Sequence, residues 1–156
     1  MPPLTEYKLL PEGVCTLTLA QVERLFGSFQ RSDRRVKLYQ QLSEYVTELR
    51  QAKLNVSLIV NGSFVMPAVD DPEDIDLILV LPRDWDSQAD VRPFEYNLLS
   101  KRAIKRKYGF DVFVVRDGSP EEREWIAFFT QINVKWCQPP HDLPIDCKKG
   151  LVRITL

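Results

Sequence analysis

Hydrophobic and polar residues follow one another along this chain in two patterns, one typical of helices and the other typical of buried strands. Residues 33–53 carry apolar side chains at three- and four-residue spacing with charged residues between them, which predicts a long amphipathic helix. Three shorter runs are almost entirely apolar and rich in β-branched residues, which predicts buried strands. These runs cover residues 56–60, 75–81 and 110–115. We therefore expect the α/β class, of the α+β kind, with a small mixed β-sheet flanked by helices.

Three further helices are predicted, two of them from signals for helix caps. Thr18 followed by Gln21 matches a capping box, which opens a short helix. Ser119 followed by Pro120 supplies an N-cap and a first helical residue for another. The three predicted helices run over residues 18–27, 93–108 and 120–131.

The chain is expected to form a single domain, residues 1–156, with three parts. Prolines at three of the first 11 positions predict an extended N-terminal segment, residues 1–17, without a helix or strand. Residues 18–131 form the predicted core, interrupted by a polar loop at residues 82–92. Residues 132–156 are expected to form a proline-rich loop and then a candidate edge strand with the sequence LVRITL.

Charge and composition argue against several classes of protein. The 21 Lys and Arg residues nearly balance the 22 Asp and Glu residues, so the chain lacks the overall basic charge typical of nucleic-acid or membrane binders. No run approaches the roughly 20 apolar residues of a membrane span, and the N-terminus has no signal-peptide pattern. Three widely spaced cysteines fit reduced thiols better than a disulfide framework. We therefore expect a cytoplasmic protein with no membrane partner.

The first candidate for chemistry is a Gly-Ser pair directly after a predicted strand. The run VSLIV leads into Asn61, Gly62 and Ser63. Glycine lets backbone amides approach a ligand closely, and such a turn offers N–H groups and a hydroxyl to a phosphate. A plain turn uses the same residue types, so this pair alone does not decide between the two interpretations.

Two aspartates mark the start of the next predicted strand. Asp74 and Asp76 flank Ile75, and the two-residue period of a strand places both carboxylates on one face. Like charges side by side repel each other and lose hydration, which a bound cation would offset. Mg²⁺ prefers such oxygen ligands. A solvated strand end with acidic turn residues is the alternative.

A third carboxylate, Asp111, interrupts the apolar run at residues 110–115. In a buried strand it needs a partner, which is either the metal ion held by the other two aspartates or a basic residue of the preceding helix. That helix carries five basic residues, Lys101, Arg102, Lys105, Arg106 and Lys107. They form either a solvated face favoured by the helix dipole or, through Lys101 or Lys105, a contact with phosphates.

Taken in order, Gly62-Ser63, Asp74-Ile75-Asp76 and Asp111 resemble the motif of the nucleotidyltransferase-fold superfamily, also called polymerase-beta-like. That motif is a Gly-Gly or Gly-Ser pair after a hydrophobic residue, then Asp-x-Asp or Asp-x-Glu, then a single carboxylate on a later strand. The strings NGSFV, PEDID, YGFDVF and GLVRITL also resemble a group of small uncharacterised bacterial proteins of this superfamily. The resemblance implies the nucleotidyltransferase fold.

The resemblance also implies a role for each motif residue. Asp74 and Asp76 would bind two Mg²⁺ or Mn²⁺ ions, and Asp111 would bind one of them and help to activate the attacking hydroxyl. Gly62 and Ser63 would hold the triphosphate of the nucleotide donor.

The predicted activity is transfer of a nucleoside monophosphate from an NTP to a hydroxyl acceptor on RNA, a protein or a small molecule. Small members of the superfamily often belong to toxin-antitoxin or phage-defence pairs, which implies a cognate protein partner. Two alternatives stay open. One is a catalytically silent nucleotidyltransferase-fold module that binds a partner, as an antitoxin does, and the other is a two-metal phosphohydrolase that uses the same carboxylates.

Overall fold

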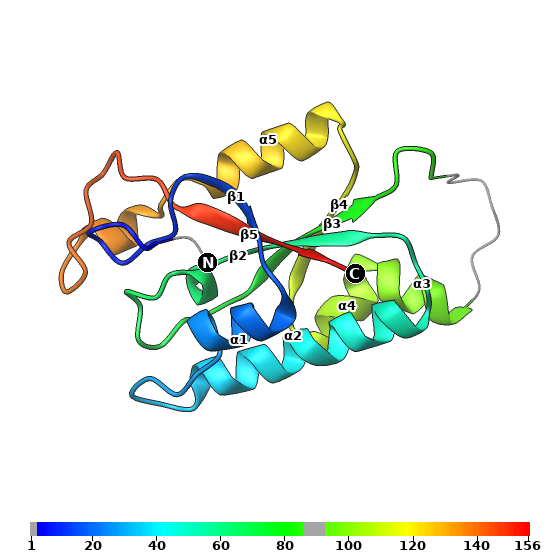
Figure 1. Cartoon of the computed structure of the whole chain (residues 1–156), viewed down its shortest axis with the longest axis horizontal. Helices are drawn as coiled ribbons and strands as arrows, with labels where there is room; N and C mark the ends of the chain where they lie inside the picture. Colours follow the sequence, from blue (N-terminus) through cyan, green and yellow to red (C-terminus); the bar gives the residue numbers. More distant parts are fainter. Residues whose placement is uncertain (1–2, 86–92) are drawn as a thin grey trace.

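In residues 3–85 and 93–156, which the computed structural model describes, five strands form one mixed sheet with helices on both of its faces (Figure 1). The strands are β1 (Gly13–Thr16), β2 (Ser57–Asn61), β3 (Asp76–Leu81), β4 (Asp111–Arg116) and β5 (Gly150–Thr155). Their spatial order is β1-β5-β2-β3-β4. The pairs β1–β5 and β3–β4 are parallel, and β2 runs antiparallel to both of its neighbours. The expected mixed sheet with flanking helices is confirmed.

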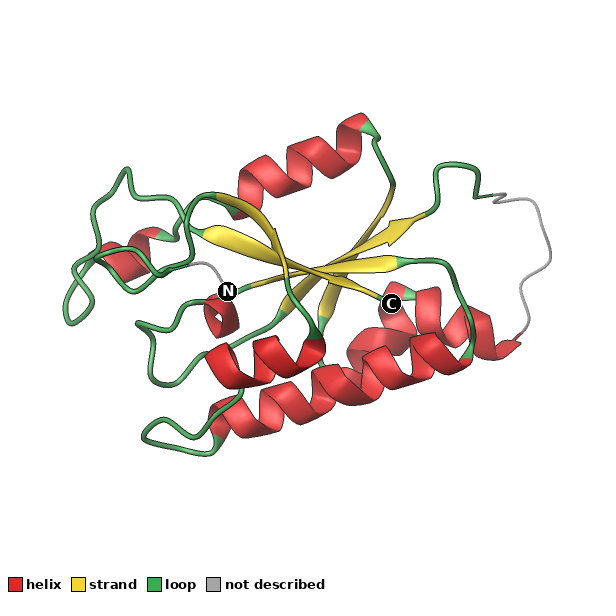
Figure 2. Cartoon of the chain, in the orientation of Figure 1, coloured by secondary structure: helices red, strands yellow, loops and turns green. Residues whose placement is uncertain are grey.

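The helices cover the two faces of the sheet unequally, as Figure 2 shows. Four of those in the described residues pack on one face, namely α1 (Leu19–Phe26), α2 (Arg34–Gln51), α3 (Pro93–Leu99) and α4 (Lys101–Tyr108). The opposite face is covered by α5 (Pro120–Phe129). Two short 3₁₀ helices, η1 (Ser63–Val65) and η2 (Val134–Cys137), lie in the loops. Within the described part of the chain, no helix is both long and apolar enough to cross a membrane.

The central strands bury side chains on both faces, which explains why their sequences are almost continuously apolar. Leu58 of β2 and Leu77 of β3 point into the larger core, which is closed by α1 to α4. Their neighbours Ile59 and Ile78 point to the opposite side, into the smaller core beneath α5. All four side chains are completely buried.

Both predicted helix starts are confirmed by the caps themselves. Thr18 Oγ1 accepts a hydrogen bond from the Gln21 backbone N–H at 3.1 Å, and Gln21 Oε1 accepts one from the Thr18 N–H at 2.9 Å. The helix that they open ends at Phe26 with Gly27 as its C-cap, close to the predicted end. Ser119 Oγ accepts a hydrogen bond from the Glu122 N–H at 3.1 Å and caps α5.

The strand predicted at residues 151–156 is confirmed as β5, but two other predictions for the ends of the chain are wrong, and one strand pairing explains both errors. Residues 1–17 were predicted to lack a strand, but within them β1 pairs with β5; residues 1 and 2 lie outside the described residues. The segment LVRITL is not an edge strand, because β5 lies between β1 and β2. Its side chains Leu151, Val152 and Ile154 are buried. A pairing between segments so far apart in sequence leaves no local pattern to detect.

The predicted helix over residues 93–108 is two helices, α3 and α4, divided at Ser100. The backbone of Ser100 is extended, with φ −80° and ψ 120°, and its side chain accepts a hydrogen bond from the Ala103 N–H at 3.3 Å. Ser100 therefore caps a new helix instead of continuing the first. Of the polar loop predicted at residues 82–92, residues 86–92 lie outside the described residues.

Candidate functional site

Three neighbouring strands carry polar side chains at one end of the sheet. Because β2 and β3 are antiparallel, Asn61 at the end of β2 pairs with Asp76 at the start of β3. Because β4 is parallel to β3, its first residue, Asp111, is the register partner of Asp76. Asn61, Asp76 and Asp111 therefore form one row across three strands.

Gly62 makes the turn that follows β2, and its position requires glycine. Its φ is 94°, in the left-handed half of conformational space that side chains disfavour. A Cβ atom there would lie 2.9 Å from the Asp74 carbonyl oxygen and 3.0 Å from Asp74 Oδ1. The turn thus lets the backbone lie directly against Asp74.

Ser63 and Asp74 are joined by a local hydrogen-bond network. Asp74 Oδ1 accepts hydrogen bonds from the Ser63 backbone N–H at 3.1 Å and from the Ser63 hydroxyl at 3.0 Å. The Ser63 hydroxyl in turn accepts one from the Glu73 N–H at 2.9 Å. Both donors that the sequence assigned to a phosphate therefore orient a carboxylate in this structure.

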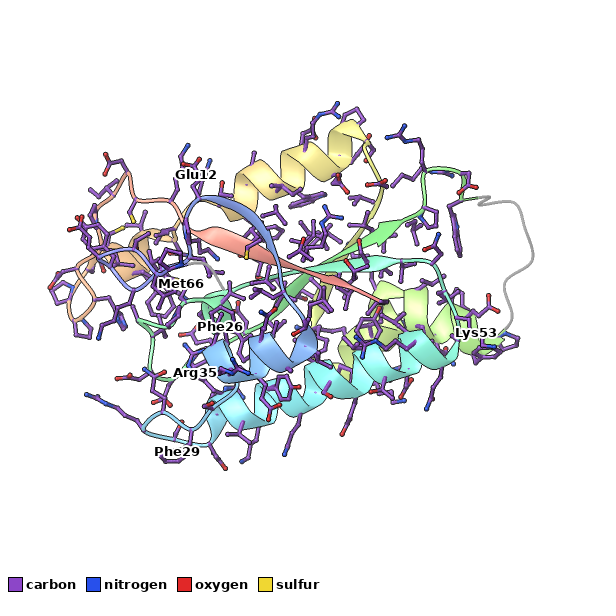
Figure 3. All side chains as sticks on the ribbon, viewed as in Figure 1. Glu12, Phe26, Phe29, Arg35, Lys53 and Met66 are labelled. Carbon is purple, nitrogen blue, oxygen red and sulfur yellow. The ribbon has the colours of Figure 1, made fainter. Side chains whose placement is uncertain are left out.

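The loop between Ser63 and Asp74 is held by the buried Arg35 at the start of α2. The Arg35 guanidinium donates hydrogen bonds to four backbone carbonyl oxygens, those of Phe26 at 3.2 Å, Phe64 at 2.6 Å, Met66 at 2.7 Å and Val69 at 2.5 Å. Figure 3 labels Arg35, Phe26 and Met66 at the same end of the molecule. One side chain of α2 thus ties α1 and this loop together.

The residues around Asp74 and Asp76 line a pocket of about 260 Å³. Its walls combine the ends of β2 and β3 with the segments that follow α5 and precede β5. The lining includes Asn61, Gly62, Ser63, Asp74, Asp76, Phe128, Lys135, Trp136 and Lys149. Four predicted site residues therefore belong to one pocket, namely Gly62, Ser63, Asp74 and Asp76.

Lys149 is a pocket residue that the sequence reasoning missed. The side chain is 5% exposed, and its ammonium group donates a hydrogen bond to Asn61 Oδ1. In the sequence it follows Lys148 and precedes an apolar run, which is typical of a solvated strand end. The one sequence signal for Lys149 is its position just before a predicted strand. A lysine at such a position can lie in a pocket or on the surface, so this signal does not identify a pocket residue.

Asp76 and Lys149 carry opposite charges, yet burial disfavours the charged form of each. Burial, then the charges of Asp74 and Asp111, raise the pKa of Asp76 to about 6, against the opposing effect of Lys149 and Lys105. Burial lowers the pKa of Lys149 to about 8, although Asp76 and Asp74 oppose the shift. In a favourable ion pair both shifts would have the opposite sign. The pocket therefore holds charges that the described residues compensate incompletely, as functional sites often do.

Asp111 is more exposed than a carboxylate in a buried strand would be, because β4 is an edge strand. Its side chain is 58% exposed and forms an ion pair with Lys105 Nζ at 3.2 Å. The Lys101 ammonium lies 5.0 Å from the centre of the Phe113 ring. Neither lysine lines the pocket. The structure therefore brings Asp111 beside Asp76, but Asp111, like the two lysines, is not among the residues that line the pocket.

Comparison with known protein families covers nearly the whole chain. Residues 2–155 match DUF6932, described as a family of unknown function. The chain belongs to this family. No curated protein and no solved structure matches it.

A divalent cation is the cofactor that the motif implies for this DUF6932 chain. Among residues 3–85 and 93–156, no three His, Cys, Asp or Glu side chains are grouped closely enough to hold a metal ion as they stand. The donors nevertheless fit such an ion in type, since carboxylate oxygens are the ligands that Mg²⁺ and Mn²⁺ prefer. The donors also fit a cation in charge. Repulsion by Asp74 and Asp111 contributes to the raised pKa of Asp76, and a bound cation would offset that repulsion.

Asp76→Asn is expected to stabilise the folded chain at neutral pH. The pKa of Asp76 rises from 3.8 to about 6 on folding, so between these values the folded state binds more protons and stability falls as pH rises. The asparagine amide does not ionise, so the variant does not lose this stability as pH rises. We expect similar stability near pH 4 and a gain of about 1–3 kcal/mol at pH 7, measured by urea unfolding across this range.

Asp142→Asn is the control, because it removes a carboxylate that is exposed. It should change the free energy of unfolding by less than about 0.5 kcal/mol at either pH. An Asp76→Asn chain that is less stable than the wild type at pH 7 would mean that Asp76 and Lys149 stabilise each other overall.

Proposed function

We propose that this chain is a metal-dependent nucleotidyltransferase that moves a nucleoside monophosphate from an NTP to a hydroxyl group of an RNA, protein or small-molecule acceptor. The observation that supports this most strongly is the pocket that Asp74 and Asp76 share with Gly62, Ser63 and the buried Lys149. Carboxylates suit divalent cations, whereas lysine suits phosphates. A complex of an NTP with metal ions requires both kinds of group within reach of each other.

Asp74, Asp76 and Asp111 are the residues that would hold two Mg²⁺ or Mn²⁺ ions. Bound there, the ions would polarise the α-phosphate and neutralise the pyrophosphate that leaves. The two hydrogen bonds from Ser63 to Asp74 Oδ1 orient that carboxylate, as outer hydrogen bonds commonly orient metal ligands. The ion pair of Asp111 with Lys105 is exposed, and exposed pairs are weak enough to exchange for another partner.

In the proposed reaction the hydroxyl oxygen of the acceptor attacks the α-phosphorus of the NTP. The bond from that phosphorus to the bridging oxygen of the β-phosphate breaks, and pyrophosphate leaves with the electron pair. The hydroxyl proton passes to a carboxylate, for which Asp111 is the proposed base. No covalent intermediate with the protein is needed.

The size of the pocket limits how much of a nucleotide it encloses. Its volume of about 260 Å³ is slightly below the roughly 300–1,000 Å³ of pockets that bury most of a small ligand. The pocket therefore suits one part of an NTP, with the remainder and the acceptor on the surface outside.

Titration of the wild-type chain with each of the four NTPs, with and without Mn²⁺, tests this function by calorimetry. We expect Mn²⁺-dependent binding of at least one NTP. That NTP, labelled at the α-phosphate, then separates the reaction classes. Label on an RNA or protein with release of pyrophosphate supports transfer, whereas labelled nucleotide hydrolysed by water indicates a phosphohydrolase. A folded chain that binds no NTP under any condition would favour the catalytically silent module that binds a partner.

A further inference from the structure

The backbone at Lys149 and Gly150 is fixed by two separate segments of the chain. The Lys149 N–H donates a hydrogen bond to the Thr130 carbonyl oxygen, and the Gly150 N–H donates one to the Leu10 carbonyl oxygen, both at 3.0 Å. A Cβ atom at residue 150 would lie 2.1 Å from the Pro11 carbonyl oxygen, so Gly150 is required there. The start of β5 is thus held rigidly between the N-terminal segment and the end of α5.

From this anchor the Lys149 side chain reaches into the pocket. Its ammonium group makes a hydrogen bond to Asn61 Oδ1, the one acceptor that it has within the described residues. A lysine ammonium carries three N–H donors. Two of them therefore remain for a group that enters the pocket.

Two other residues of the pocket with donor groups, Lys135 and Ser63, are already engaged. Lys135 also lines the pocket, but its side chain is 47% exposed and forms an ion pair with Glu73 at 2.9 Å. The N–H and hydroxyl of Ser63 both donate to Asp74. Of the two lysines that line the pocket, Lys149 is therefore the one better able to donate hydrogen bonds to an anion.

The burial of Lys149 is unexplained by packing, since an apolar side chain would fill the same space without losing hydration. Nearby carboxylates do not fully compensate the charge, because burial lowers the pKa of Lys149 despite the opposing effect of Asp76 and Asp74. Once a cation occupies those two carboxylates, Lys149 requires another anion. A phosphate group has the charge and the several acceptor oxygens that match an ammonium group.

We propose that Lys149 is a phosphate-binding residue of the pocket, whose ammonium group donates hydrogen bonds to a phosphate of the donor nucleotide while Asn61 Oδ1 accepts another. This inference rests on the proposed function and assigns to Lys149 the phosphate contact that the sequence pattern assigned to Lys101 or Lys105. Asp74 and Asp76 would hold the metal ions, and Lys149 the phosphate, within the same pocket.

The test compares three chains by calorimetry at pH 7: the wild type, Lys149→Met and Lys148→Met. Each is titrated with Mn²⁺ alone and then, at fixed Mn²⁺, with inorganic tripolyphosphate and with the NTP that binds best to the wild type. Lys148 is the matched control, because it is the adjacent lysine and its exposed side chain pairs with Glu12 at 3.6 Å. We expect Lys149→Met to weaken binding of tripolyphosphate and NTP by about 10- to 100-fold. Its binding of Mn²⁺ should stay unchanged or become tighter, and Lys148→Met should match the wild type.

Several outcomes would overturn the inference. A Lys149→Met chain that binds tripolyphosphate and NTP as the wild type does overturns it and leaves the proposed function standing. A wild type that binds Mn²⁺ but neither tripolyphosphate nor any NTP overturns both. Loss of Mn²⁺ binding in Lys149→Met would give Lys149 a structural role instead. If Lys149→Met does not fold, Lys149→Gln replaces it, because glutamine keeps an N–H donor for Asn61 but carries no charge.

Discussion

Replacing Asp74 and Asp76 together by asparagine is expected to abolish metal-dependent nucleotide binding and to lower nucleotidyl transfer by more than about 100-fold. Asparagine has nearly the shape of aspartate and keeps an oxygen that can accept the two hydrogen bonds from Ser63. It lacks the charge that a divalent cation requires of its ligands. The fold should survive the change, since like-charge repulsion contributes to the raised pKa of Asp76 in the wild type.

Calorimetry with Mn²⁺ and NTP, a transfer assay with labelled NTP, and thermal unfolding measure these effects. The matched control is Asp142→Asn/Asp146→Asn, which also removes two carboxylates but takes them from exposed positions of the C-terminal loop. This control should bind and transfer as the wild type does. Metal-dependent binding that persists in the Asp74→Asn/Asp76→Asn chain would contradict the proposed metal ligands.

Arg35→Met is expected to destabilise the chain by about 3–5 kcal/mol and to abolish metal-dependent nucleotide binding with it. Methionine fills a similar volume but leaves the carbonyl oxygens of Phe26, Phe64, Met66 and Val69 without their charged donor. A buried carbonyl left without a partner costs about 1–3 kcal/mol. The Met66 oxygen keeps a hydrogen bond from the Val69 N–H, and methionine avoids burying a charge, so the net cost is smaller than four such losses. The loop to Asp74 would no longer be held in place. Burial lowers the pKa of Arg35 to about 10, so the donor is charged throughout the neutral range. Urea unfolding and Mn²⁺–NTP titration measure the two effects.

Arg34→Met is the comparison for Arg35→Met. Arg34 precedes Arg35 and donates hydrogen bonds to the Pro72 carbonyl oxygen at 3.0 Å and to that of Glu73, but it is exposed. Exposed groups recover hydrogen bonds from water, so its loss should cost less than about 1 kcal/mol. Equal destabilisation by the two variants would show that burial of Arg35 is unimportant for the loop.

The elements that the sequence predicts correctly are those decided by neighbouring residues. The Thr18 and Gln21 capping box acts within one helical turn, and the apolar runs of β2 and β3 reflect burial on both faces. Ser100 also signals a helix start locally, but it stands within a stretch whose pattern is helical on both sides. The sequence pattern therefore predicts one continuous helix and does not identify Ser100 as the N-cap of a second one.

The pocket is predictable in part, because four of its residues lie at the adjoining ends of two strands that are neighbours in both sequence and space. Gly62 and Ser63 directly follow β2, Asp76 begins β3, which pairs with β2, and Asp74 lies two residues before it. Lys149 directly precedes a strand on the other side of β2, so its place depends on the pairing of β5. The exposure of Asp111 depends likewise on β4 being an edge strand. The place of Lys149 and the exposure of Asp111 therefore depend on the order of the strands in the sheet, which local sequence patterns do not specify.

The position of β5 also matters while the chain is being made. Of the described strands, β5 comes last in the sequence, yet it occupies the interior of the sheet between β1 and β2. Both of those strands leave the ribosome long before their shared partner, so a growing chain exposes two unpaired strand edges that invite aggregation. Lys149 directly precedes β5, so a product that terminates before residue 149 lacks both the strand and the pocket lysine. Translation must therefore proceed through β5 before the molecule has a complete pocket.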